Sequence, residues 1–123
     1  MFKFDWKLAE NDFTKKTPVT LRMLLSHSAG TSQTSYFRST PTQPLPTIVE
    51  ILSGVKISAT RAVDVNSEPD AMFGCSGGGS IIAQLALMDV AKETFSALTQ
   101  ALLFYKLAMH NFSFEQPLPA KFV

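Results

Sequence analysis

The sequence contains few of the residues that hold metals or form disulfides. Among 123 residues there is one cysteine, Cys75, and the two histidines, His27 and His110, lie far apart in the chain. A single cysteine excludes an internal disulfide and a cysteine-based metal site, and the histidines lack metal-ligand spacing. We therefore expect no metal site and no other cofactor.

Excess charge and long apolar runs are also missing. Eleven basic and ten acidic residues give a formal net charge of +1, with no run of either sign. Since a balanced surface does not attract polyanions, we expect no nucleic-acid partner. No window approaches the roughly 20 apolar residues of a membrane span, and residues 1–7 lack the apolar core of a signal peptide. The chain as written is therefore expected to be cytoplasmic.

Hydrophobic residues are abundant and recur with a helical period. They make up 46% of the chain and include ten phenylalanines, which predicts a single packed domain rather than disorder. Capping residues and periodicity predict helices at 21–27, 48–53, about 80–92 and from Thr94 to Met109. Weak alternation at 61–65 favours a short strand, and the proline-rich segment 31–46 favours a long loop.

The last two predicted helices carry broad apolar stripes, which are typical of core packing. In the first, Ile81, Leu85 and Met88 repeat at helical spacing, and Leu87 and Val90 widen the stripe toward full burial. In the second, one continuous face is expected, formed by Phe95, Leu98, Leu102, Tyr105 and Met109.

A glycine-rich turn at 71–80 separates an apolar approach from the third predicted helix. Three consecutive glycines follow Ser76, and glycine lets a backbone turn sharply or approach another group closely. The pattern predicts extended chain entering a helix, with free N–H groups of the helix N-terminus aimed at the turn. Such a turn can present a small polar side chain to a cleft. Cys75 within it is either a small buried apolar residue or an accessible thiol.

Two short motifs match those of serine enzymes. Gly74–Gly78 matches G-x-S-x-G, a nucleophile elbow with Ser76 as the nucleophile, for which Asp89 and His110 would complete the triad. Asp89, however, lies in the helix directly after the turn, where a triad acid is not expected. The segment 53–56 matches S-x-x-K, but the pattern there favours a helix end, because Gly54 interrupts the required helical turn.

Four segments together resemble the class C β-lactamase-related serine hydrolases, a family that includes penicillin-binding-protein-like peptidases and esterases. They occur in matching order and spacing at 19–31, 68–69, 76–79 and 114–119. The first segment, VTLRMLLSHSAGT, is the most specific. The resemblance implies a mainly α fold, the helical subdomain of a β-lactamase/transpeptidase-like α+β fold, with short strands and long loops. Residues 1–123 would be a single partial domain without the N-terminal S-x-x-K segment and the C-terminal sheet.

The resemblance also implies a catalytic turn. The family's Tyr-x-Asn or Tyr-Ser-Gly element, which assists proton transfer, falls on Cys75, Ser76 and Gly77, so that cysteine replaces the tyrosine. The family's glycine after Glu-Pro corresponds to Asp70, and the glycine of its Pro-Leu-Gly-Met corresponds to Ala108.

The resemblance implies the function of a truncated serine hydrolase, and we expect this chain to be inactive by itself. The complete family forms an acyl ester with a β-lactam, a peptidoglycan peptide or a small ester. The expected partner is the missing sheet portion of the fold, or another protein on an exposed apolar face. Two alternatives are a non-catalytic helical binding or interaction module and a small esterase with Ser76 in the elbow.

Overall fold

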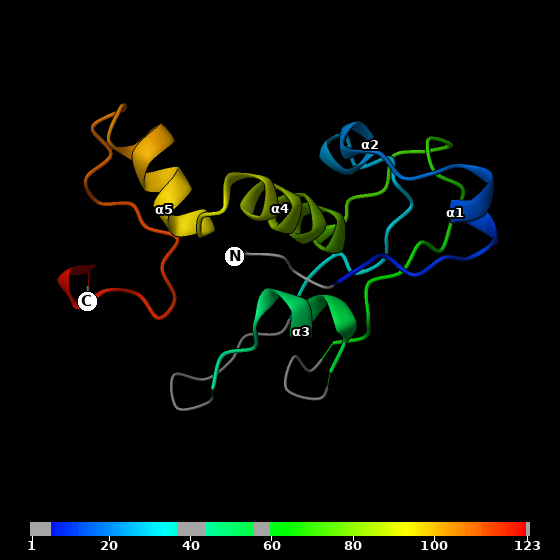
Figure 1. Cartoon of the computed structure of the whole chain (residues 1–123), viewed down its shortest axis with the longest axis horizontal. Coiled ribbons are helices and arrows are strands. Elements are labelled where there is room, and N and C mark those ends of the chain that lie inside the picture. Colours follow the sequence, from blue (N-terminus) through cyan, green and yellow to red (C-terminus); the bar gives the residue numbers. More distant parts are fainter. Residues whose placement is uncertain (1–5, 37–43, 56–59, 123) are drawn as a thin grey trace. The chain divides into compact units, whose positions relative to one another are not determined.

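A computed structural model describes residues 6–36, 44–55 and 60–122 (Figure 1). These residues fall into two compact units, one within Phe4–Leu85 and one within Ala86–Val123. The α-helices are α1 (Asp12–Lys16), α2 (Leu21–Leu25), α3 (Ile48–Ser53), α4 (Gly77–Ala91) and α5 (Phe95–Thr99). A π-helical turn, Gln100–Phe104, continues α5, and a 3-10 turn forms at Ala120–Phe122.

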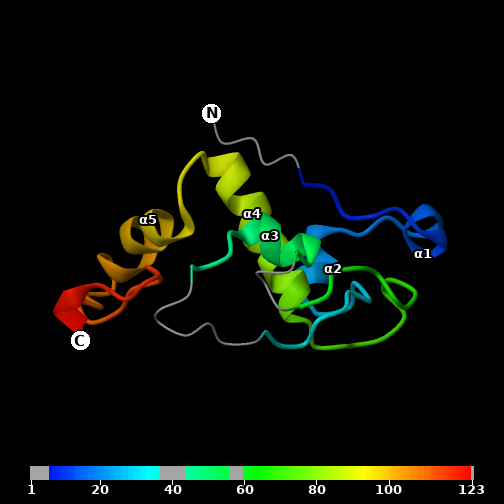
Figure 2. The same ribbon diagram turned by 90° about the horizontal axis from the view of Figure 1, so that it is seen from below.

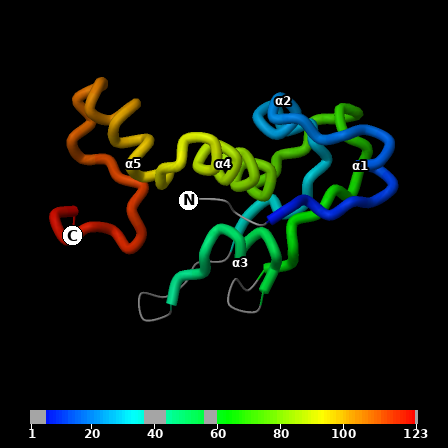
Figure 3. The backbone as a smooth tube through the Cα atoms, viewed as in Figure 1, coloured from blue at the N-terminus to red at the C-terminus, as the bar shows by residue number. Residues whose placement is uncertain are grey.

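The expected α+β fold is wrong. Among the described residues there are five α-helices and no β-strand, so this is a small helical fold rather than part of a transpeptidase-like α+β fold. The predicted strand at 61–65 is reduced to one isolated bridge between Thr31 and Val65. The two segments run side by side (Figure 3), but the pairing does not extend, because the Asp64 N–H donates to the Ser32 hydroxyl instead of a backbone carbonyl.

Three helices begin at the threonines that predicted them. The hydroxyls of Thr20, Thr47 and Thr94 each accept a hydrogen bond from the N–H three residues on. At α3, Glu50 completes a capping box with Thr47, whose hydrogen bonds lower the pKa of the Glu50 carboxyl. The same helix ends at Gly54 in the left-handed conformation, with φ of 64°.

Helix α1 was not predicted from the sequence, because its signal is confined to its cap. Asn11 accepts hydrogen bonds from the N–H groups of Phe13 and Thr14, and the Thr14 hydroxyl accepts one from the Asn11 N–H. The Asn11 amide also donates to the Val65 carbonyl at 2.7 Å. The capping residue therefore joins α1 to the segment that forms the bridge.

The core of the first unit lies between α3 and the beginning of α4, which overlap in Figure 2. Leu52, Val63 and Leu85 are buried, and four partly buried side chains pack around them: Trp6, Ile48, Ile81 and Ile82. The predicted burial of the whole apolar stripe of α4 is wrong, because Leu87 is 45% exposed and Val90 84% exposed.

Phenylalanine rings form the centre of the second unit. The ring of Phe104 stacks on Phe114 at 5.7 Å and lies 5.9 Å from Phe112, while Phe95 meets Phe114 edge to face at 5.0 Å. The expected continuous helical face is wrong, since Tyr105 is 69% exposed and Phe104 is buried. The π-helical hydrogen bond from the Tyr105 N–H to the Gln100 carbonyl changes the helical period, so residues beyond it leave the predicted face.

No helix in the described part of the chain is long and apolar enough to cross a membrane.

Candidate functional site

The glycine-rich turn is joined to the rest of its unit through Ser76, which is 2% exposed. The Ser76 hydroxyl accepts a hydrogen bond from the Gly79 N–H at 3.0 Å, as an N-cap residue of α4 does. It also accepts from the Thr31 hydroxyl at 3.0 Å and donates to the Ser32 carbonyl at 2.8 Å. The hydroxyl is thus buried and hydrogen-bonded on several sides.

The glycines after Ser76 allow the chain segment 31–34 to lie directly against the start of α4. A Cβ at Gly78 would stand 2.6 Å from the Ser32 carbonyl oxygen and 2.9 Å from a methyl group of Val63. The expectation that the first N–H groups of this helix are free is wrong for Gly78 and Gly79. The Gly78 N–H donates to the Gln33 carbonyl at 2.9 Å, and the Gly79 N–H is taken by Ser76.

His27 holds the turn at two points. Its carbonyl accepts from the Gly74 N–H at 2.8 Å, and its Nδ1 atom accepts from the Ser76 backbone N–H at 3.3 Å. The imidazole meets the Phe73 ring edge to face, with centroids 5.9 Å apart. The backbone of His27 is left-handed, with φ of 56°. Its side chain therefore contacts the backbone of Ser76 and not the Ser76 hydroxyl.

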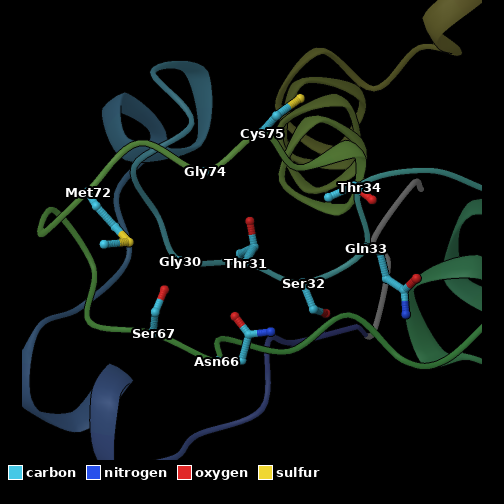
Figure 4. A pocket seen from close by; sticks show the side chains of 10 residues that line it. All are labelled: Gly30, Thr31, Ser32, Gln33, Thr34, Asn66, Ser67, Met72, Gly74 and Cys75. Carbon is cyan, nitrogen blue, oxygen red and sulfur yellow. The ribbon is translucent and has the colours of Figure 1, made fainter.

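Cys75 lies between Gly74 and Ser76 and, unlike the buried Ser76, is exposed. It stands at the rim of a shallow hollow of about 240 Å³, whose middle is faced by the side chains of Met72, Ser67 and Asn66 (Figure 4). The ten lining residues are all uncharged, and most carry hydroxyl or amide groups. The hollow offers hydrogen bonds to a neutral polar group and carries no charge to pair with an ion.

Gly77, the third residue of the predicted catalytic turn, lies in the first turn of α4. A Cβ there would meet the ring of Tyr36 and the carbonyl of Thr34, both at 3.2 Å. The Tyr36 hydroxyl is buried without a hydrogen-bond partner within the described residues, and burial raises its pKa.

Other predicted site residues have separate environments. Asp89 forms an ion pair with Lys92 at 2.9 Å, and His110 is exposed in the second unit. Ser53 is the last residue of α3, while Lys56, its partner in the S-x-x-K match, lies outside the described residues. In the described ranges, no group of His, Cys, Asp and Glu residues has the arrangement of a metal site.

The residues that contact the turn from distant parts of the chain were not predicted from the sequence. Thr31, Ser32 and Gln33 contact it across more than forty residues of chain, and they lie in a segment predicted only as loop. His27 was predicted as a residue at a helix end. No local pattern marks either contact.

No family model, no curated protein and no solved structure matches this chain.

Proposed function

We propose that the chain is one part of a β-lactamase-related serine hydrolase, to which it contributes the turn at Cys75, Ser76 and Gly77. The observation that carries the proposal is the backbone at two positions where the family has glycine. Asp70 and Ala108 are both left-handed here, with φ of 68° and 53°. Few residues other than glycine adopt this conformation. The backbone at both positions therefore has the left-handed conformation that a glycine there would favour.

The geometry of the turn supports the same assignment. Cys75, to which the resemblance assigns the position of the family's proton-transferring tyrosine, is exposed and borders the hollow. The neighbouring Ser76 is turned inward and caps α4. A thiol is a weaker hydrogen-bond donor than a phenol and ends much closer to the backbone, so Cys75 does not supply the tyrosine's oxygen.

This chain is proposed to be inactive without further polypeptide. Acyl transfer needs an activated nucleophile and donors that stabilise the developing oxyanion. The resemblance assigns the nucleophilic S-x-x-K and the Lys/His-x-Gly element to segments outside the four matched ones. We propose that a protein segment carrying these elements completes the site, and that the substrate is an acyl compound of the family's type.

Activity of a completed chain tests the proposal. The chain is fused to the S-x-x-K and Lys/His-x-Gly segments of an active family member, and hydrolysis of a chromogenic β-lactam and a short-chain ester is measured. We expect the unfused chain to show no turnover above background. The fusion should gain activity with Cys75→Tyr but not with Cys75→Phe, because phenylalanine has the ring without the hydroxyl. Equal activity of the two variants would refute the assignment of the turn. Turnover by the unfused chain that disappears in Ser76→Ala would instead support the esterase alternative.

A stability measurement separately tests whether the left-handed backbone at Ala108 is strained. Ala108→Gly should stabilise the chain by about 0.5–1 kcal/mol, because glycine relieves the strain of a left-handed alanine. Ala86→Gly, inside α4, is the control and should destabilise by about 1 kcal/mol. Thermal melts of both variants give the comparison. Equal destabilisation by the two substitutions would show that Ala108 is not strained.

A second candidate function, a non-catalytic interaction module, is favoured by exposed apolar side chains in the second unit. Val90, Leu102 and Leu107 are 84%, 60% and 61% exposed. Where such side chains form a contiguous patch, the patch is typical of a surface that binds another protein. Under this alternative the fusion gains no activity from Cys75→Tyr.

A further inference from the structure

We propose that His27 is a positioning residue for the glycine-rich turn and that protonation of its imidazole loosens the turn at Ser76. Two hydrogen bonds from the turn end on this one residue, from the Gly74 N–H to its carbonyl and from the Ser76 N–H to its Nδ1. Cys75 lies between these two donors. These two hydrogen bonds hold the turn whether or not the chain takes part in acyl transfer.

The hydrogen bond to Nδ1 requires an unprotonated ring. A neutral imidazole has one nitrogen that accepts and one that donates, so Nδ1 accepts from Ser76 only when the ring proton is on Nε2. A second proton makes both nitrogens donors. The Ser76 N–H then faces another N–H, and one of the two hydrogen bonds between His27 and the turn is lost.

The surroundings of His27 contain few groups that titrate. The charged or titratable residues on the preceding helix α2 and on the facing segment are Arg22, Glu68, Asp70 and Cys75. Asp70 is joined to Ser28, since its N–H donates to the Ser28 carbonyl at 2.7 Å and its carboxylate accepts from the Ser28 hydroxyl at 3.3 Å. Glu68 forms an ion pair with Lys16. Among the described residues, His27 contacts the turn through an imidazole, a ring that can take up a second proton.

The consequence is a turn whose order depends on pH. Above the range in which imidazole takes up a proton, both bonds hold Gly74 and Ser76. Below it, the backbone bond to the His27 carbonyl remains and the side-chain bond is absent, so the segment carrying Cys75 opens more often.

Amide exchange of the whole chain, followed by NMR and corrected for the intrinsic rate, tests the proposal. Between about pH 7.5 and about pH 5, protection of the Ser76 amide should fall by about tenfold, the equivalent of one hydrogen bond. The chemical shift of this amide should move with the same midpoint as the His27 ring protons. A Ser76 amide that stays constant while the His27 ring titrates would overturn the proposal.

Three variants separate His27 from other causes. His27→Asn keeps an acceptor near the Nδ1 position and tolerates a left-handed backbone, so Ser76 should stay protected within about twofold at both pH values. His27→Gly removes the acceptor and should give low protection at both. Asp70→Asn should leave the pH response unchanged. A response that survives in His27→Asn, or one that disappears in Asp70→Asn, would assign it to another group.

Discussion

Replacing Gly78 with alanine is expected to destabilise the chain by about 2–4 kcal/mol. The added methyl group would stand 2.6 Å from the Ser32 carbonyl oxygen and within 3.0 Å of both methyl groups of Val63. Neither neighbour moves easily, since the Ser32 carbonyl also accepts from the Ser76 hydroxyl and Val63 belongs to the core. A small domain has about 5–15 kcal/mol of total stability, so the loss would be large. Urea unfolding followed by circular dichroism measures it.

Gly74→Ala is the matched control for this substitution. It changes a glycine four residues earlier in the same turn, where an added Cβ has nothing within 4 Å. We expect its free energy of unfolding to stay within about 0.5 kcal/mol of the original. Equal effects at the two positions would mean that segment 31–34 does not lie against α4.

Leu52→Ala is expected to cost about 2–5 kcal/mol, because its side chain has no solvent exposure and lies at the centre of the first unit's core. Three buried residues form that core, so few neighbours are available to fill the cavity. The loss of methyl and methylene contacts therefore adds to the loss of burial.

Leu25→Ala provides the comparison for the core substitution. Leu25 is also a helical leucine but is 69% exposed at the end of α2. Its replacement should change the free energy of unfolding by no more than about 0.5 kcal/mol. Thermal and urea unfolding of both variants decide the matter, and similar losses at the two positions would contradict the burial of Leu52.

Local signals in the sequence predicted the capped helices well. Thr20, Thr47 and Thr94 begin the helices they were expected to begin, because a capping hydroxyl bonds to an N–H only three residues away. Longer-range features were not predictable in this way. The strand at 61–65 was expected from alternation alone, yet the Asp64 N–H donates to the Ser32 hydroxyl and the pairing stays a single bridge.

The candidate site was predictable in part. The run of glycines indicated a close backbone approach, and the approaching segment is 31–34. The contacts of Ser76 with Thr31 and Ser32 had no signal in the sequence, since they depend on how distant segments pack. The fold class was wrong because it was extended from a resemblance in four segments to an architecture that those segments do not form here.

The hydrogen bond from Ser76 to Ser32 also bears on how the chain folds. It joins residues 44 positions apart, and closing a loop of that length costs roughly 3 kcal/mol of chain entropy. Contacts of this kind are favourable only after much of the intervening chain is ordered, so the start of α4 is expected to join segment 31–34 late in folding. Disorder introduced anywhere between these two serines would then weaken the hydrogen bond between them, and with it the position of Cys75.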